Sequence, residues 1–327
     1  MECTAVYLIE IWRKVMYNVV AIGGGTGLSI LLSELKKKFN VTAVVTVGDT
    51  GGGSGILRAD LNMLPPGDIR NCLLALSEAP EDLQAFFSYR FQNGSLKGQS
   101  LGNLIIAGIT EKRGSFQEGI TLLSRVLKLK GKVLPVTLEP MNLVAFLENG
   151  NCIHGEAEIQ EFLEAKNTHI QKLQLKENVS INKEIIDEIK KAKFVILGPG
   201  SLYTSVICNL LVDGMTDILQ DKTIVYICNV MTQPGETTDY EVSKHVSEIE
   251  KYLQREVDYV LANTLEPFNA MLSPYKLEGS KPVIVTENDE ILLKNKLITG
   301  DFIEERKGYL RSNAYNITER LYKLFND

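Results

Sequence analysis

The 327-residue sequence has few of the side chains that carry most nucleophilic and metal chemistry: one Trp, three His and five Cys. The cysteines are Cys3, Cys72, Cys152, Cys208 and Cys228. An odd number without Cys-x-x-Cys spacing is typical of reduced thiols in a cytosolic protein and disfavours a zinc site. The histidines are His154, His169 and His245. They fall in hairpin or surface-helix contexts, so we expect no Ser-His-Asp or Cys-His catalytic arrangement.

The sequence also lacks a long apolar run and an excess of positive charge. A membrane helix needs about 20 consecutive apolar residues, so no membrane insertion is expected. The net charge of −6 disfavours a broad nucleic-acid interface, while 44% hydrophobic residues are enough for a core. Glu10 interrupts the apolar start of the chain, and Met16 directly precedes the first expected strand. We therefore expect Met16 to be the natural start and residues 1–15 to be a non-native extension.

Apolar, β-branched runs, each followed by a turn and then a helical pattern, predict an α/β fold. The main runs are 17–22, 41–47, 194–197, 223–228 and 259–262. Their alternation with helices predicts a Rossmann-like, mainly parallel sheet with helices on both faces. Residues 282–285 are expected to add an edge strand.

We expect one α/β domain, residues 16–327, with two insertions. A helical insertion is predicted at about 68–128, and a small antiparallel β extension at about 132–160. Within the latter, Asn149-Gly150 stands between apolar flanks and is a typical hairpin turn. Isoleucines at 181, 185, 186 and 189 predict an amphipathic helix before the second half of the sheet.

Four distinctive loops follow the expected strands: GGGTGLS (23–29), GDTGGGSG (48–55), GPGSLYTS (198–205) and NVMTQPGET (229–237). In an open parallel sheet, ligands bind outside the carboxyl ends of the strands, where these loops meet. Glycine lets the backbone approach a ligand closely, and the amides of a helix start attract phosphate. The loops therefore predict one crevice for a small phosphate-bearing molecule, although a tight packing turn would also use such glycines.

The first loop does not fit the common nucleotide motifs completely. Leu28 stands where G-x-G-x-x-G has its third glycine. Asp49 lies at the distance expected of a ribose-binding acid, but it belongs to another glycine-rich loop. No G-x-x-x-x-G-K-[ST] segment occurs, which excludes a P-loop lysine. An NAD-binding oxidoreductase therefore stays an alternative beside phosphate chemistry and simple binding.

Glycines and polar residues in and near these loops are the candidate ligand-binding residues. Asp49 and Asp68 could hold Mg²⁺ on a diphosphate or act catalytically in a transferase, or serve only as a turn residue and a helix cap. Arg70, in a first helical turn, opposes the helix dipole and favours an anionic partner. The candidates are Gly24, Gly25, Thr26, Asp49, Gly51, Gly52, Ser54, Asp68, Arg70, Asn71, Asn103, Gly200, Ser201 and Thr204.

The order of the motifs between residues 19 and 237 resembles the YvcK-type proteins, the gluconeogenesis-factor branch of the CofD-like superfamily. The matching segments include VTVGDTGGGSGILR, PPGDIRNCLLALSE, GQSLGNLIIA, GPGSLYTSVICNLLV and VYICNVMTQPGET. The resemblance implies a cytoplasmic regulatory protein that binds UDP-N-acetylglucosamine. It also implies a need for the protein in growth on gluconeogenic carbon sources, in cell shape and in cell-wall synthesis, with a cell-wall synthesis protein as partner.

The resemblance also implies an alternative and two further site residues. CofD enzymes transfer a 2-phospholactyl group from a guanosine diphosphate-linked donor to the deazaflavin Fo with Mg²⁺. Tyr275 and Arg311 match the tyrosine and arginine to which sugar-nucleotide contacts are attributed in that branch.

The sequence departs from the family pattern at several positions. Thr50 and Gly53 replace an acid and a serine of the second loop, and Ile56 replaces an arginine. Ser312 and Asn313 stand where a histidine and an aspartate are usual. These changes weaken the case for Mg²⁺-dependent catalysis. The sequence leaves open whether the protein is an enzyme and whether it forms a homodimer.

Overall fold

The computed structural model describes residues 16–166, 168–272, 275 and 279–326. Its centre is a seven-stranded, all-parallel sheet in the order β10-β9-β8-β7-β1-β2-β3. The strands are β1 (Asn18–Gly23), β2 (Asn40–Val45), β3 (Lys132–Pro135), β7 (Phe194–Leu197), β8 (Ile224–Ile227), β9 (Tyr259–Asn263) and β10 (Leu297–Gly300). The α/β, Rossmann-like prediction is confirmed.

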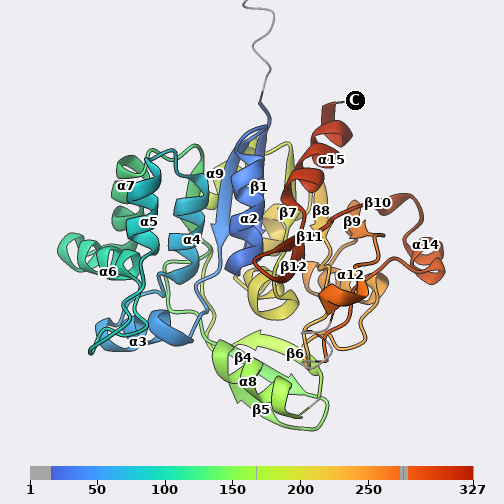
Figure 1. Ribbon diagram of the computed structural model, residues 1–327, viewed down its shortest axis with the longest axis horizontal. Helices are drawn as coiled ribbons and strands as arrows, with labels where there is room; N and C mark the ends of the chain where they lie inside the picture. Colours follow the sequence, from blue (N-terminus) through green and yellow to red (C-terminus); the bar gives the residue numbers. More distant parts are fainter. Residues whose placement is uncertain (1–15, 167, 273–274, 276–278, 327) are drawn as a thin grey trace, which may run out of the picture.

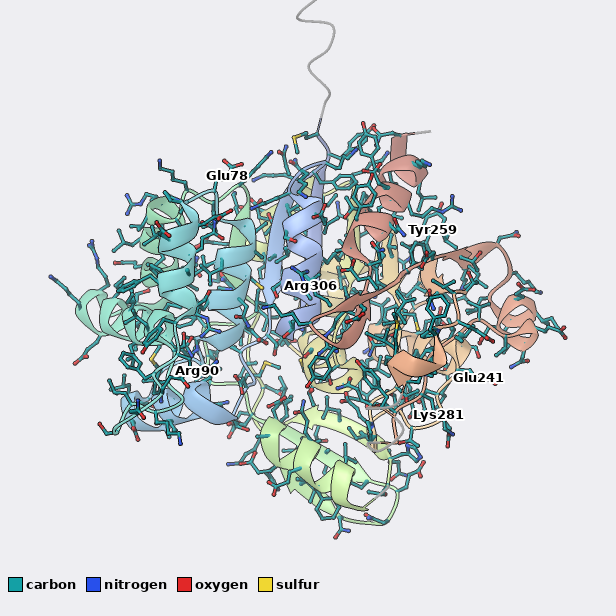
Figure 2. The ribbon with its side chains drawn as sticks, viewed as in Figure 1. Glu78, Arg90, Glu241, Tyr259, Lys281 and Arg306 are labelled. Atoms are coloured by element: carbon teal, nitrogen blue, oxygen red, sulfur yellow. The ribbon has the colours of Figure 1, made fainter. Side chains whose placement is uncertain are left out.

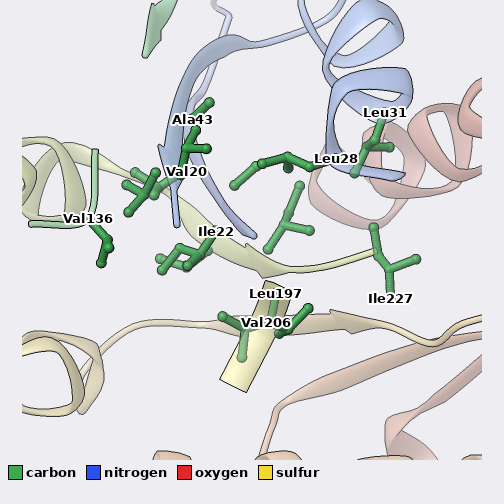
Figure 3. Packing of buried hydrophobic residues seen from close by; sticks show 14 of the residues in the cluster. Val20, Ile22, Leu28, Leu31, Ala43, Val136, Leu197, Val206 and Ile227 are labelled. Atoms are coloured by element: carbon green, nitrogen blue, oxygen red, sulfur yellow. The ribbon is translucent and has the colours of Figure 1, made fainter. Parts of the chain in front are cut away.

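The central strands consist of apolar residues because both faces of the sheet are covered. Residues 19–22 of β1 are at most 1% exposed, which explains a continuous apolar run rather than an alternating one. Helix α2 (Gly25–Leu35) buries Leu28, Leu31, Leu32 and Leu35 at helical spacing. Leu28 and Leu31 belong to the same buried cluster as Val20 and Ala43 of the sheet (Figure 3).

Helices lie on both faces of the sheet, as predicted. Helix α2 lies between α4 (Gly67–Leu76) and α15 (Ala314–Asn326) on one face (Figure 1). Helix α9 (Lys183–Lys191), the amphipathic helix expected from the isoleucine spacing, packs with α11 (Met215–Leu219) on the other face. Helix α2 begins at Gly25, so the glycine loop itself forms its first turn.

The segment predicted as a helical insertion, about 68–128, forms α4 and the helices beside it at the β3 edge of the sheet (Figure 1). These are α5 (Glu81–Ser88), α6 (Leu101–Arg113) and α7 (Phe116–Val126). A further helix, α3 (Gly52–Leu61), starts inside the second glycine-rich loop, before the range expected for the insertion. Both glycine-rich loops therefore lead directly into helix N-termini, which places backbone amides at the carboxyl edge of the sheet.

The β extension is a separate three-stranded antiparallel sheet in the order β5-β4-β6, covered by one helix. We call residues 143–175 the β4–β6 unit: β4 (Leu143–Leu147), β5 (Cys152–His154), α8 (Glu156–Lys166) and β6 (Ile170–Leu175). The predicted turn at Asn149-Gly150 joins β4 to β5. Lys132–Pro135 does not belong to this unit, because it pairs in parallel with β2 and forms one edge of the large sheet.

The predicted edge strand at residues 282–285 is wrong. That segment makes an isolated bridge between Pro282 and Met231 and single backbone hydrogen bonds from Val283 to Val230 and from Val285 to Asn263, but it forms no continuous ladder, and its proline has no N–H to donate. The edge strand is instead β10, which pairs in parallel with β9.

The remaining elements lie between residues 202 and 312, in the C-terminal half of the chain. They are η1 (Leu202–Ile207), α10 (Cys208–Leu210), α12 (Val242–Leu253), η2 (Asn269–Leu272), α14 (Glu287–Leu293), η3 (Lys294–Lys296) and a hairpin of β11 (Ile303–Arg306) and β12 (Tyr309–Ser312). Among the described residues, no helix has the length and apolar character needed to cross a membrane.

Candidate functional site

The order of strands reverses between β1 and β7, where the loops that follow these two strands meet. Strands β2 and β3 extend from one side of β1, and β7, β8 and β9 extend from the other. The loops pack so tightly that a side chain at Gly27 would come within 2.9 Å of the Pro199 carbonyl oxygen. Ligands of open α/β sheets bind at such a reversal, so the predicted loops do lie where a ligand site is expected.

Two cavities lie at this edge, one on each side of the first glycine loop. The cavity that we call the β12 cavity has a volume of about 370 Å³, and its walls include Thr26, Gly200, Glu236, Tyr309 and Arg311. The α3 cavity has a volume of about 420 Å³ and is lined by the N-termini of several helices, among them α2, α3, α4 and α8.

The candidate residues divide between the two cavities. The α3 cavity is lined by Gly25, Asp49, Gly51, Gly52, Ser54, Asp68, Arg70, Asn71, Asn103 and Thr204. The β12 cavity is lined by Thr26, Gly200, Ser201, Tyr275 and Arg311. Gly24 lines neither, but a side chain at this position would lie 2.7 Å from Asp68 and 2.5 Å from Thr46. Gly24 therefore allows the close packing that forms the site.

Asp68 joins helix α4 to the first glycine loop. Its Oδ2 accepts a hydrogen bond of 2.8 Å from the Gly25 amide, so one of the amides expected to face a phosphate is already bonded. Burial raises the pKa of Asp68 to about 6, and the Asp49 charge adds to this effect. The Gly25 hydrogen bond and Arg70 act in the opposite direction.

Asp49 holds the second glycine-rich loop in shape. Its Oδ1 accepts a hydrogen bond of 2.7 Å from the Gly51 amide. Arg58, which sequence analysis did not single out, donates to the Met141 carbonyl at 2.9 Å and to Asn142 Oδ1 at 2.6 Å. Arg58 also lies 3.4 Å from the Asp49 carbonyl oxygen and thereby connects this loop to the segment that precedes β4.

A third carboxylate, Glu156 in the first turn of α8, also lines the α3 cavity. Burial raises its pKa to about 8, with further contributions from the charges of Asp49, Asp68 and Glu236. Sequence analysis missed Glu156 because it belongs to the β4–β6 unit and follows no glycine-rich loop.

The carboxylates of the α3 cavity suit a cation that keeps most of its water ligands better than a metal ion coordinated entirely by protein side chains. Among the described residues, no three His, Cys, Asp or Glu side chains lie close enough together to hold a metal ion. Mg²⁺ usually keeps several waters and binds through one or two carboxylates plus substrate phosphates. Asp49 and Asp68 fit that type of binding.

Arg70 lines the α3 cavity together with Asn71 and Asn103. Its position in the sequence favoured an anionic partner, but its hydrogen-bond partners in the structure are side-chain amides. Its Nη1 donates to Asn103 Oδ1 at 2.9 Å and its Nη2 to Asn71 Oδ1 at 2.8 Å. Its buried Nε has no hydrogen-bond partner in the described structure. Burial and the nearby Arg90 lower the pKa of Arg70. Arg90 extends from the loop after α5 beside α3 (Figure 2).

At the third loop, residues 198–205, the backbone amides that were expected to face a ligand phosphate already bind the buried side chain of Glu236. Glu236 Oε1 accepts hydrogen bonds from the amides of Tyr203, at 2.7 Å, and Thr204, at 3.4 Å. The Ser201 hydroxyl lies 2.6 Å and 2.7 Å from the two Glu236 carboxylate oxygens, and it does not cap η1. Burial raises the pKa of Glu236 despite these bonds. These amides therefore already bind the Glu236 carboxyl group, whereas Thr26 and Gly27 of the first turn of α2 line the β12 cavity.

The β11–β12 hairpin presents aromatic and cationic groups to the β12 cavity. The Arg311 guanidinium lies 5.1 Å from the centre of the Tyr309 ring, a cation–π distance. The Tyr275 hydroxyl accepts a hydrogen bond of 2.6 Å from the Leu310 amide and thus fixes β12. Tyr275 therefore positions the hairpin, while Tyr309, which sequence analysis missed, lies beside Arg311.

No His or Cys occurs among the described residues that line the two cavities, although the buried Cys208 thiol contacts Thr46 and Thr204 of the α3 cavity wall. Burial lowers the pKa of His245 to about 4 and raises that of Cys208 to about 12, so the first is neutral and the second a thiol at pH 7. His154 is exposed on β5. Cys3 lies outside the described residues.

Comparison with known proteins identifies the family of the chain. The model of the 2-phospho-L-lactate transferase CofD family matches residues 19–303. The chain belongs to the CofD family.

Relatives with the same fold are similar over nearly the whole chain. The gluconeogenesis factor of Halalkalibacterium halodurans is 42% identical over 93% of this chain and 95% of its own length. The gluconeogenesis factor of Bacillus subtilis is 38% identical over 95% and 98%. A crystal structure of a Bacillus halodurans protein has a TM-score of 0.89 and 40% identity, covering 94% of this chain and 99% of that one.

Proposed function

We propose that this CofD-family protein binds a nucleotide sugar, with UDP-N-acetylglucosamine as the ligand, and acts as a cytoplasmic regulator. The observation that carries the proposal is the pair of chemically different cavities on either side of the α2 N-terminus. A nucleotide sugar likewise has two different ends joined by a diphosphate.

The β12 cavity suits the nucleoside. Val230, Met231 and the Tyr309 ring provide apolar surface for a base, and Asn229 and Gln233 provide donors and acceptors for its edges. Each cavity alone is near the lower end of the range of small-molecule sites, about 300–1,000 Å³. A ligand as long as a nucleotide sugar therefore extends from one cavity into the other.

The α3 cavity suits the hydroxyl-rich sugar and part of the diphosphate. The amides in the first turns of α2 and α3 and the charge of Arg70 attract anionic oxygens. Asp49, Asp68 and Glu156 repel them unless protons or a cation offset their charge. Bound Mg²⁺ supplies that positive charge, and Asp49 and Asp68 are the residues that hold it.

A regulatory role agrees with the chemistry of the cavity walls. The described lining residues include no Cys or His to act as nucleophile or base, and related chains carry the name gluconeogenesis factor. We therefore assign the protein a role in coordinating gluconeogenic growth with cell-wall synthesis and cell shape, through a cell-wall synthesis protein that recognises the ligand-bound form.

Titration calorimetry with UDP-N-acetylglucosamine in the presence of Mg²⁺ tests the proposal. Arg311→Ala should weaken binding at least about tenfold, because hydrogen bonds to charged groups contribute about 1.5–3 kcal/mol. Arg306→Ala is the matched control: Arg306 lies in the same hairpin but outside the β12 cavity (Figure 2). No heat of binding with the unmodified protein, or equal losses in both variants, would refute the assignment.

The carboxylates of the α3 cavity favour one second candidate, a CofD-type transferase of phosphorus-containing groups that uses Asp49 and Asp68 with Mg²⁺. Incubation with a guanosine diphosphate-linked phospholactate donor, Fo and Mg²⁺ distinguishes the two functions. We expect no transfer to Fo by mass spectrometry, and turnover that Asp49→Asn abolishes would establish the transferase instead.

A further inference from the structure

Gln160 occupies a singular position between the two cavities. Among the described residues, it alone lines both the β12 cavity and the α3 cavity. It comes from α8 of the β4–β6 unit. The first turn of α2 also lies at this boundary, since Gly25 faces the α3 cavity while Thr26 and Gly27 face the β12 cavity. A ligand that occupies both cavities therefore passes between Gln160 and the start of α2.

A chain of hydrogen bonds fixes the orientation of the Gln160 amide. Gln160 Nε2 donates to Thr204 Oγ1 at 3.3 Å, and Thr204 Oγ1 lies 2.8 Å from Ser201 Oγ. Ser201 donates to Glu236, a carboxylate that is 3% exposed. The Gln160 amide nitrogen can only donate, so it donates to Thr204, and with Glu236 ionised the Thr204 hydroxyl in turn donates to Ser201. The chain thus has one direction, which strengthens each bond and holds the amide at the boundary.

The β4–β6 unit has several polar contacts to the loops of the large sheet, and Gln160 makes one of them. Thr50 accepts a hydrogen bond of 3.0 Å from the Ala157 amide and donates one to Glu158. Leu163 lies against Gly235, where a side chain would come within 2.4 Å of the Leu163 carbonyl. The position of α8 therefore depends on the same loops that form the two cavities.

We propose that Gln160 binds the diphosphate of the nucleotide sugar and couples occupancy of the site to the order of the β4–β6 unit. This inference rests on the proposed function. The Gln160 amide has a second N–H besides the one donated to Thr204, and an N–H is the group that a diphosphate oxygen accepts. Binding at this point links α8 to α2 through the ligand, so the β4–β6 unit presents a different, more ordered surface when the ligand is bound.

Calorimetry with two ligands tests the contact. UDP-N-acetylglucosamine spans the boundary, whereas UMP fills one cavity. We expect Gln160→Ala to weaken binding of the sugar nucleotide about tenfold and to change UMP binding less than twofold. Gln160→Glu should weaken binding of the sugar nucleotide further, because it places a negative charge beside the diphosphate. Glu161→Gln, an exposed neighbour on α8, is the control and should match the wild type.

The results of these titrations distinguish a failure of the Gln160 inference from a failure of the proposed function. A wild-type protein that binds neither ligand refutes the proposed function and the inference with it. A wild-type protein that binds UDP-N-acetylglucosamine, with Gln160→Ala equal to it, overturns the inference alone. Thermal unfolding of each variant shows that a loss of binding is not a loss of folding.

Hydrogen exchange tests the coupling at saturating ligand. In the wild type, UDP-N-acetylglucosamine should slow amide exchange at least fivefold in peptides from residues 156–163. In Gln160→Ala, saturated with ligand at a higher concentration, the α2 amides should still be protected and those of α8 should not. Equal α8 protection in both proteins would overturn the coupling.

Discussion

Gly55→Ala should lower the free energy of unfolding by about 1–3 kcal/mol and weaken nucleotide-sugar binding. A Cβ at this position in α3 would lie 2.0 Å from the Thr50 carbonyl oxygen and 2.5 Å from its carbon. Both are backbone atoms, so the loop must move, and overpacking of this kind typically costs about 1–3 kcal/mol. Thr50 bonds to the Ala157 amide, so its displacement also moves α8. Urea unfolding and calorimetry measure the two effects.

Gly108→Ala is the matched control for this substitution. Gly108 lies inside helix α6, and nothing lies within 4 Å of a Cβ built there. Alanine in an unobstructed helix interior should stabilise the protein by about 0.5–1 kcal/mol, because glycine loses more backbone freedom on folding. The same chemical change thus has opposite expected signs in two helices. A Gly55→Ala protein as stable as the wild type would disprove the close packing of the Thr50 loop.

Local signals made the large sheet and the meeting of the glycine-rich loops at one edge predictable. The apolar strands and the glycine-rich loops that follow them are short patterns, and parallel strands bring their carboxyl ends to one edge. The edge strand was not predictable in this way. Residues 282–285 and β10 are both short apolar segments, and only the pairing of β10 with β9 distinguishes them.

Side chains contributed by distant segments explain what sequence analysis missed at the site. Glu156 and Gln160 come from a unit inserted after β3, and the bond between Thr50 and Glu158 joins residues 108 positions apart. Glu236 was part of a recognised loop, but its carboxylate contacts Ser201 and the η1 amides, which no local pattern indicates. Charge partners of this kind follow from tertiary packing.

Thr50 stands where the family pattern has an acid, and its contacts to α8 explain how a threonine serves at this position. The hydroxyl of Thr50 can accept from the Ala157 amide and donate to Glu158 simultaneously. A carboxylate at this position can accept from the amide but would face Glu158 with a like charge. Thr50 therefore attaches α8 to the loop without adding another negative charge beside Asp49, Asp68 and Glu156.

Glu156→Gln should stabilise the protein at pH 8 and leave its stability near pH 5 almost unchanged. The pKa of Glu156 is about 8 in the folded protein against an ordinary value of 4.5, so folding favours the protonated form. Between these pH values the folded state binds more protons than the unfolded state, and the free energy of unfolding falls as pH rises. Glutamine avoids this loss, and we expect a gain on the order of 3 kcal/mol at pH 8.

Urea unfolding from pH 5 to pH 9, in EDTA to remove divalent cations, measures this difference. Glu161→Gln, which removes an exposed carboxylate from the same helix, is the control and should follow the wild type at every pH. The difference between Glu156→Gln and the wild type should grow with pH up to about pH 8, because the unfolded chain ionises Glu156 while the folded protein keeps it protonated, and it should level off once both states are ionised. A constant difference across the range would mean that Glu156 is already ionised at pH 5, and that the α3 cavity tolerates three negative charges without help from protons or a cation.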